Sequence, residues 1–465
     1  MKKIAIIYGA YETGLQKKSV EVLTESLLDY TLEYPLCFAY DEKADFSAYR
    51  CIYIGTKENN GYIARASSEN LTHPEEYCLT VQGDTAIIEG SDDSGVLYGC
   101  VDFFDRYIVG CEHPDNDRYW INPMEEAWPD FSLRSAPAVR YRGIWTWGHV
   151  IYHYKGFIDH MVRLKMNMLI VWNDHPPVNA ADMIAYAHAC GVKLIWGFSW
   201  FWDTHCGEID IEQAMACSDE ILARYEKEYQ PLGGDGVYFQ SFTELSGEKI
   251  GDKLIAEAVT AFVNQTAAGF FKKYPDMELQ FGLHATSVRE KLSYIQAVDP
   301  RIRIVWENCG AFPFSYVPND VQNFDATCAF VEKIAALRGE KDRFGVVTKG
   351  LTKLDWTQFE HIQGPIHVGV STEWMKENRI IRKRRIWRAL QAGWIAHGDK
   401  AFRMIRLMQQ CKQGDFVSTA LVEDGMFEEQ IMFPVALYAE MLWDGESDLK
   451  EIQQRVALRS NVTFA

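Results

Sequence analysis

The sequence predicts an α/β fold: a (β/α)8 barrel of the TIM type, preceded by a small α/β domain and followed by a helical segment. Short β-rich runs alternate with helical patterns up to about residue 135, where a Pro-marked junction follows. Strand-then-helix units then repeat for about 235 residues, the span that eight β/α units need. After Trp374 the pattern is helical. The expected parts are a domain at 1–135, a barrel at 136–398 and a helical segment at 399–465.

Short apolar runs bounded by turn residues predict the strands of the first domain. Two of them flank Gly83-Asp84, a pair typical of a tight hairpin turn. Gly95–Phe104 then carries apolar residues at helical spacing, which predicts a helix. The strand candidates are Ile4–Tyr8, Cys51–Gly55, Tyr77–Val81 and Ala86–Gly90.

The barrel prediction depends on eight further β-rich runs separated by helical patterns. No Gly-x-Gly-x-x-Gly follows any of these runs, which weakens the alternative of a nucleotide-binding doubly wound sheet. The strand candidates are Tyr141–Trp145, Met168–Trp172, Lys193–Phe198, Gly236–Gln240, Leu279–Leu283, Arg303–Trp306, Phe344–Val347 and Ile366–Val370. The helical stretches include Phe157–Lys165, Ala181–Cys190, Ile211–Tyr229, Lys249–Lys273 and Phe324–Leu337.

Composition and charge restrict the possible partners. Charged residues make up 24% of the chain and hydrophobic residues 48%, as in an ordinary soluble globular protein. The formal net charge of −18 argues against a broad surface for nucleic acid or anionic membranes, because both need a cationic excess. No apolar run approaches the roughly 18 residues of a membrane span. We therefore expect neither nucleic acid nor a membrane as a partner.

The beginning of the chain and its cysteines indicate the compartment. Met1–Gly9 has too short an apolar stretch for a signal peptide and is interpreted as a first strand. The 11 cysteines include no Cys-x-x-Cys pair, which fits neither a disulfide framework nor a structural zinc site. We expect a cytoplasmic protein without a cofactor. The sequence leaves open whether it forms a homo-oligomer.

Aromatic residues make up 13% of the chain, and 14 of them are Trp. Indole rings often line sugar sites, because a pyranose presents apolar C–H faces that stack on them. A large core is the alternative explanation, and composition does not separate the two.

Two stretches carry a family resemblance. Ile87–Gly99 looks like the end of the small domain that precedes the barrel in family 20 β-hexosaminidases and in the α-glucuronidases of families 67 and 115. Arg140–Asp174 resembles the first β/α unit of the hexosaminidase barrel, where Arg-Gly opens strand one and Lys-x-Asn-x-Leu introduces strand two. Ala439–Trp443 is similar to the late segment of that family. The resemblance implies an exo-acting glycoside hydrolase whose substrate is a carbohydrate.

One departure from the family pattern concerns the mechanism. In family 20, strand four ends in an Asp-Glu pair, in which the Asp orients the acetamido group of the substrate and the Glu acts as the acid. This chain keeps the Glu at Glu244 and places Thr243 where the Asp should stand. The acetamide-assisted mechanism would lack its orienting carboxylate.

Glycoside hydrolysis usually needs two carboxyl groups at the carboxyl ends of the barrel strands. Glu244, just beyond strand four, is the expected general acid, since an aromatic run precedes it and an apolar setting favours a protonated carboxyl group. The second carboxylate is either Glu307, after strand six, or Glu373, after the expected strand eight. Sequence leaves open whether the reaction retains or inverts the anomeric configuration.

The expected substrate-binding residues also lie near strand ends. The resemblance matches Arg142 to the arginine that binds sugar hydroxyls in family 20, although Arg142 could instead support the barrel floor. Asp174 matches the Asp that ends strand two in that family, and a helix cap is its alternative role. Trp306 and Trp374 adjoin the candidate carboxylates and are expected to form the aromatic walls. The remaining candidates are Trp147 and Trp200.

Two other functions remain open. His284, Glu307 and His367 could form part of a metal site in a sugar isomerase or epimerase, although no His-x-His or His-Glu-x-x-His spacing supports it. A glycan-binding protein that has lost catalysis is the second alternative. The glutamates at the strand ends argue against it.

Overall fold

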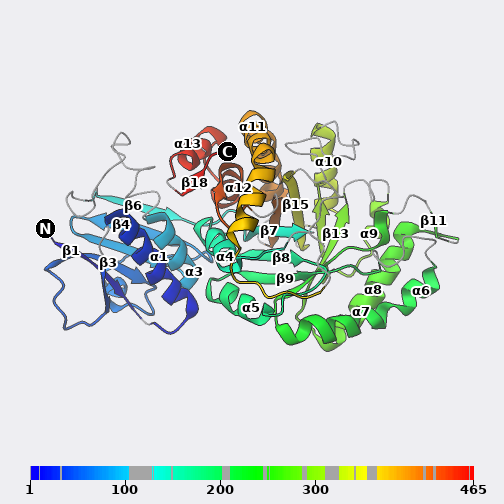
Figure 1. The fold of residues 1–465 in the computed structure, drawn as a ribbon, viewed down its shortest axis with the longest axis horizontal. Helices are drawn as coiled ribbons and strands as arrows, with labels where there is room; N and C mark the ends of the chain where they lie inside the picture. The colour runs from blue at the N-terminus through cyan, green and yellow to red at the C-terminus, as the bar shows by residue number, and fades with distance from the viewer. Residues whose placement is uncertain are drawn as a thin grey trace.

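The chain forms two α/β units side by side, which Figure 1 shows for the computed structural model. A six-stranded sheet forms the first unit and a closed parallel barrel forms the second, which confirms the predicted fold class. The structure describes residues 2–9, 11–31, 34–103, 128, 130–147, 150–201, 210–244, 249–250, 252–284, 291–308, 324–339, 342–352, 364–411, 415–422, 426–459 and 461–465.

The N-terminal domain is a sheet with helices on both faces. Side chains alternate along its first strand: Ile6 packs in the cluster that includes Leu23 and Val96, and Ile7 packs in a cluster with Ile63 on the other face. The strands, in the order β2-β1-β3-β5-β4-β6, are β1 (Lys3–Tyr8), β2 (Leu36–Ala39), β3 (Tyr49–Gly55), β4 (Tyr77–Gln82), β5 (Thr85–Gly90) and β6 (Phe131–Ser135). The helices are α1 (Gly14–Thr31), α2 (Gly61–Ala66) and α3 (Asp93–Asp102).

The predicted hairpin around Gly83 is confirmed. β4 and β5 are antiparallel, and Gln82 is paired with Thr85 at the turn. Gly83 has a φ of 57°, the left-handed conformation that glycine adopts without strain. β1, β2, β3 and β5 are parallel to one another.

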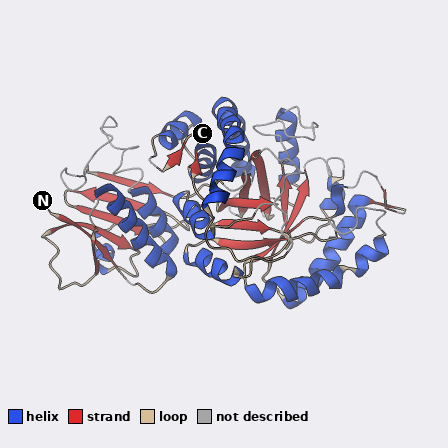
Figure 2. Ribbon diagram, in the orientation of Figure 1, coloured by secondary structure: helices blue, strands red, loops and turns tan. Residues whose placement is uncertain are grey.

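Eight parallel strands close the barrel, and Figure 2 shows helices around them. Trp145, Ile170 and Tyr238 point inward and pack together, whereas their neighbours along the chain face the surrounding helices. In order around the barrel the strands are β7 (Tyr141–Trp147), β8 (Met168–Trp172), β9 (Lys193–Gly197), β10 (Gly236–Phe239), β13 (Glu278–His284), β14 (Arg303–Glu307), β15 (Phe344–Leu351) and β16 (Phe416–Val422).

The eighth strand is not the predicted one. Residues 366–370 form no strand, because their backbone groups bond elsewhere: Val368 exchanges two hydrogen bonds with the Asn179 side chain, and Gly369 donates to Tyr152. β16 instead pairs with both β15 and β7. The barrel therefore continues past residue 398, the boundary expected from the sequence.

Helices cover the outside of the barrel. The helical segment near the end of the chain contains β16 as well as helices, and the expected boundary at 398 lies within its longest helix, α11. No helix in the described ranges is both long and apolar enough to span a bilayer. The helices are α4 (Tyr154–Arg163), α5 (Ala180–Ala189), α6 (Ile211–Ala216), α7 (Ser218–Arg224), α8 (Ile255–Lys273), α9 (Leu292–Ile295), α10 (Phe324–Ala335), α11 (Glu373–Cys411), α12 (Phe433–Trp443) and α13 (Leu449–Ala457). Short strand pairs are formed by β11 (Lys249–Ile250) with β12 (Lys253–Leu254) and by β17 (Ile431–Met432) with β18 (Val462–Thr463).

Ion pairs form the barrel floor at the amino ends of the strands. Arg303 is buried and bonds to Glu278 at 2.7 Å and to Asp415 at 3.0 Å. Arg343 bonds to the same two carboxylates, at 3.1 Å in the case of Asp415. Charged groups therefore close the barrel at the end opposite to the carboxyl ends of its strands.

Candidate active site

The carboxyl ends of β10, β14 and β15 bring a buried carboxylate together with three hydrogen-bond donors. Glu307, the last residue of β14, has no exposed surface. Its Oε1 accepts a 2.7 Å hydrogen bond from the Tyr238 hydroxyl and another from the Gln240 amide. Its Oε2 accepts from the ammonium of Lys349 on β15. Such donors stabilise the ionised form of a carboxylate.

Gly282 on β13 permits this arrangement, because β13 lies between β10 and β14 in the barrel. A Cβ at position 282 would stand 2.3 Å from the Tyr238 hydroxyl oxygen and 2.8 Å from Glu307 Oε1. Only a residue without a side chain leaves room for the two groups to meet.

Aromatic rings surround the cluster inside the barrel. The Lys349 ammonium lies 4.8 Å from the centre of the Trp145 ring, within reach of a cation–π interaction. Trp145 stacks on Trp147 with centroids 6.1 Å apart, and Trp172 meets the Tyr238 ring edge-on at 6.2 Å. Trp147 and Trp172 end β7 and β8 and are only half-buried. They form an aromatic wall at the carboxyl ends of the strands, so the predicted residue Trp147 lies in the candidate site.

Glu244 follows the same strand that carries Tyr238. After β10 the chain turns into a short 3₁₀ helix, Phe242–Glu244, whose backbone lies at the carboxyl end of the barrel. Thr243 is buried there, and its N–H donates to the carbonyl of Ser241. The side chain of Glu244 lies outside the described part of the structure.

Glu373 and Trp374 are not brought together with Glu307. Glu373 is the first residue of α11, its side chain is 84% exposed, and it pairs with Lys376 at 3.3 Å. Trp374 is 72% exposed. The sequence pattern predicts both at the end of a barrel strand that does not form, which removes the physical basis for placing them at the site.

Trp306 and Trp200 face the helical layer instead of the barrel interior. Trp306 is buried and packs against Phe330 of α10. Trp200 is buried between two phenylalanine rings: its ring centroid lies 3.6 Å from that of Phe239 and 5.3 Å from that of Phe270 on α8. Neither Trp306 nor Trp374 therefore lies among the aromatic rings that surround Glu307, where the sequence pattern predicts both.

Arg142 lies near the amino end of β7, where the barrel meets the N-terminal domain. It is buried, donates to Glu75 at 2.7 Å, and donates further to the carbonyl oxygens of Lys165, Val139 and Arg140. This geometry corresponds to the supporting role and does not place the guanidinium near Glu307.

Two further residues of the resembling stretch, Lys165 and Asn167, lie at the same junction. Lys165 donates to Asp102 of α3 at 2.7 Å, and its ammonium lies 4.4 Å from the ring centre of Trp443. Asn167 bonds to Glu75 at 2.8 Å. These residues of the resembling stretch therefore join the two domains, whereas Trp147 and Trp172 of the same stretch lie in the candidate site.

The candidate metal ligands and Asp174 are the remaining predicted residues. Asp174 is exposed in the loop after β8, and His367 is exposed in the segment before α11. His284 ends β13 beside Glu307 in the strand register, but its side chain lies outside the described residues. Among the side chains that the structure describes, no three His, Cys, Asp or Glu groups are placed to hold a metal ion.

Sequence reasoning missed Tyr238, Gln240, Lys349 and Gly282. The alternation of inward and outward side chains along a barrel strand could have indicated Lys349. Val347 points into the barrel, so Lys349, two residues later, points inward as well, but it lies beyond the predicted end of strand seven. Tyr238 and Gln240 lie within the predicted strand Gly236–Gln240. The sequence pattern gave no reason to single them out, because a glycosidase site is recognised by carboxyl groups and neither residue has one.

Comparisons with known proteins give a likeness of fold. No model of a protein family matches the sequence, and no curated protein matches it either. The solved structure of CpGH84B aligns over 97% of this chain and 70% of its own, with a TM-score of 0.55 and 11% identity. A GH20 exo-β-N-acetylglucosaminidase from Vibrio harveyi, solved in complex with N-acetylglucosamine, aligns over 98% and 72%, also with a TM-score of 0.55 and 11% identity.

A third similar structure is a GH138 enzyme targeting pectin rhamnogalacturonan II. The match covers 74% of this chain and 52% of that enzyme, at 14% identity and a TM-score of 0.48, which is too weak to support a shared function. At 11% identity, the two stronger matches establish architecture and not chemistry. The chain thus has a glycoside hydrolase-like fold, a barrel preceded by a small α/β domain.

Proposed function

We propose that the protein is a glycoside hydrolase that removes a terminal sugar, either an amino sugar, a hexose or a uronic acid. The observation that carries the proposal is the buried, donor-supported carboxylate of Glu307 at the carboxyl end of a barrel strand, beside the aromatic wall of Trp147 and Trp172. Active sites of such barrels lie at this end. An ionised carboxylate next to indole rings suits a sugar whose anomeric carbon becomes positive in the transition state.

In this proposal Glu244 is the general acid and Glu307 the second carboxylate. Glu244 protonates the departing glycosidic oxygen as the bond to the anomeric carbon breaks. Glu307 either attacks that carbon to form a covalent intermediate or removes a proton from the attacking water. The donors from Tyr238 and Lys349 support this assignment, because they favour a charged base or nucleophile over a neutral acid.

Glu307 is preferred to Glu373 as the second carboxylate because only Glu307 lies on a barrel strand. This preference allows a matched experiment. Glu307→Gln and Glu373→Gln make the same chemical change, one inside the barrel and one on an exposed helix start. A screen of nitrophenyl glycosides first identifies the sugar. We then expect the Glu307 variant to lose at least about a thousandfold in kcat and the Glu373 variant to keep it.

Glu244→Gln tests the acid role. It should abolish turnover of a poor leaving group and retain part of the rate on a dinitrophenyl glycoside, which needs no protonation. Added azide should restore part of the rate of the Glu307 variant by taking the place of the missing nucleophile or activated water. The anomeric configuration of the sugar first released by the unmodified protein, followed by NMR, reports retention or inversion. Activity of both single variants equal to that of the unmodified protein would contradict the assignment.

A further inference from the structure

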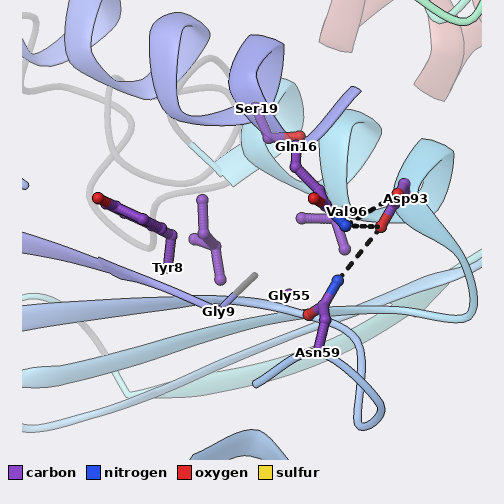
Figure 3. A pocket seen from close by; sticks show the side chains of 9 residues that line it. Tyr8, Gly9, Gln16, Ser19, Gly55, Asn59, Asp93 and Val96 are labelled. Atoms are coloured by element: carbon purple, nitrogen blue, oxygen red, sulfur yellow. Dashed lines mark hydrogen bonds between the residues drawn. The ribbon is translucent and has the colours of Figure 1, made fainter. Parts of the chain in front are cut away.

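The small cavity at the ends of β1 and β3 is closed by hydrogen bonds between its own side chains. Asp93 accepts hydrogen bonds from Thr13 at 2.9 Å and from Gln16 at 3.1 and 3.2 Å. Asn59 donates a further bond to it at 3.3 Å (Figure 3). These bonds use the roughly four acceptor positions that a carboxylate has. The cavity therefore stabilises the N-terminal domain and leaves its carboxylate no acceptor position for a ligand.

The helix α11 presents an exposed face on the outside of the barrel, where Figure 1 shows it. One side of the helix is buried, with Trp387, Trp394 and Met404 among its buried residues. On the opposite side, Ile381 is 73% exposed and Ile395 is 56% exposed. Exposed apolar side chains that share a helix face with charged ones are typical of a surface that binds a partner.

Five exposed residues follow one another along this face at the spacing of a helix–helix contact. They are Arg385, Arg388, Ala392, Ile395 and Asp399, and the steps between them alternate between three and four residues. This spacing keeps side chains in one line along an α-helix, and it is the repeat by which two helices pack side by side. These five residues form the α11 stripe, whose geometry suits another helix.

The charges of the α11 stripe are unpaired. Within the described ranges of the chain, the structure gives Arg385, Arg388 and Asp399 no ion pair. Arg382 and Arg384 are exposed beside them, so this part of α11 is positive on a chain whose net charge is −18. A positive strip attracts an acidic body, and a second copy of this chain is such a body.

We propose that two copies of the chain bind each other through the α11 stripe, with the two helices antiparallel about a two-fold axis. Ile395 of each copy then packs over Ala392 of the partner subunit, and Arg388 of each copy pairs with Asp399 of the partner subunit. Both contacts are centred on the same point of the helix, between residues 393 and 394. One axis therefore satisfies them together, and each contact occurs twice.

The charges of the stripe select the antiparallel direction. A parallel pair would place Arg388 beside Arg388 and Asp399 beside Asp399, and like charges that face each other repel. The antiparallel direction also determines which exposed residues lie outside the contact. Trp374 would face the partner subunit beyond Cys411, the last residue of its α11.

Sedimentation velocity of the full chain over roughly 1–100 µM tests the proposal, since a single helix pair is a small interface. We expect a dimer whose dissociation constant rises at least about tenfold in Arg388→Glu and in Asp399→Arg, because like charges then meet twice. Lys272→Glu reverses an exposed charge on α8, and Trp374→Ala removes an exposed ring outside the contact. Both control variants should dimerise as the unmodified protein does.

Exchange of the two charges distinguishes a second copy from any other partner. A double variant with Arg388→Glu and Asp399→Arg restores both pairs with opposite sign and should dimerise again. An equimolar mixture of the two single variants should form a heterodimer for the same reason. A chain that stays monomeric over this range, or a double variant as weak as the single ones, would overturn the proposal. Binding of a monomeric chain to phosphatidylserine vesicles, abolished in Arg388→Glu, would also overturn it and would assign the stripe to a lipid surface.

Discussion

The hydroxyl of Tyr238 reaches Glu307 at 2.7 Å across the strand between them, at the position where that strand carries Gly282. The glycine is therefore as necessary to the site as the groups that meet over it. A buried hydrogen bond to a carboxylate is lost whenever the space between its partners is filled.

Gly282→Ala should separate Tyr238 from Glu307. Overpacking of this kind costs about 1–3 kcal/mol of unfolding free energy, and urea unfolding measures it. Gly364→Ala is the matched control, since no atom of the described residues lies within 4 Å of a Cβ there. Equal stability of the two variants would argue against the close approach.

Lys349→Met should destabilise the protein by about 3–5 kcal/mol, because Glu307 would lose the buried ammonium that donates to it. Combining Lys349→Met with Glu307→Gln removes both charges and should recover part of the loss. A double-mutant cycle in urea gives the coupling. If the changes in unfolding free energy of the two single variants simply add up in the double variant, the two groups do not interact.

Trp306→Ala should cost about 3–5 kcal/mol, since it empties a buried position against α10. Trp374→Ala should change stability by less than about 0.5 kcal/mol, because the ring is mostly exposed. Thermal unfolding compares the pair. The sequence interpretation, in which both rings wall a sugar site, would instead predict similar effects on sugar binding.

Arg142→Lys should lower the unfolding free energy by about 1.5–3 kcal/mol, because a lysine cannot reach Glu75 and three carbonyls at once. The KM for any glycoside turned over should stay unchanged, since Arg142 lies at the opposite end of the barrel from Glu307. A raised KM with unchanged stability would favour the sugar-binding role.

The ion pairs of the barrel floor make the free energy of unfolding depend on pH in the acid range. Burial alone would raise the pKa of Asp415, but Arg303 and Arg343 beside it hold that pKa below its ordinary value. Its stabilising contribution is therefore complete above about pH 4, where an unfolded Asp is ionised, and is lost as the pH falls through the lowered value. Asp415→Asn should reduce this acid dependence in urea titrations, whereas Asp276→Asn, at an exposed position, should not.

The barrel was predictable where the pattern was local. Strands such as Met168–Trp172 are identified by a run of apolar residues. Ile366–Val370 has the same pattern, but its backbone bonds to Asn179 and Tyr152, which are far away in sequence. The strand that closes the barrel, β16, is harder to recognise, because it carries the polar residues Ser418 and Thr419 at its centre and follows a 39-residue helix. Which run closes a barrel is decided by long-range pairing.

The sequence predicts which residues of the candidate site lie at strand ends, but not which way every side chain there points. Glu307 was found because carboxylates after strands face the mouth of a barrel. Consecutive residues on a strand point to opposite faces, so an inward Glu307 already requires an outward Trp306. Lys349 lay past the predicted end of its strand, and its contact with Glu307 depends on which strands become neighbours.

The joint between Arg142, Glu75, Lys165 and Asp102 lies at the far end of the barrel from Glu307. Residues at that joint are constrained by their mutual contacts, whereas loops at the mouth are free to vary without loosening it. The four side chains of the joint are distinct from those that surround Glu307. A substitution in one group can therefore leave the contacts of the other group intact.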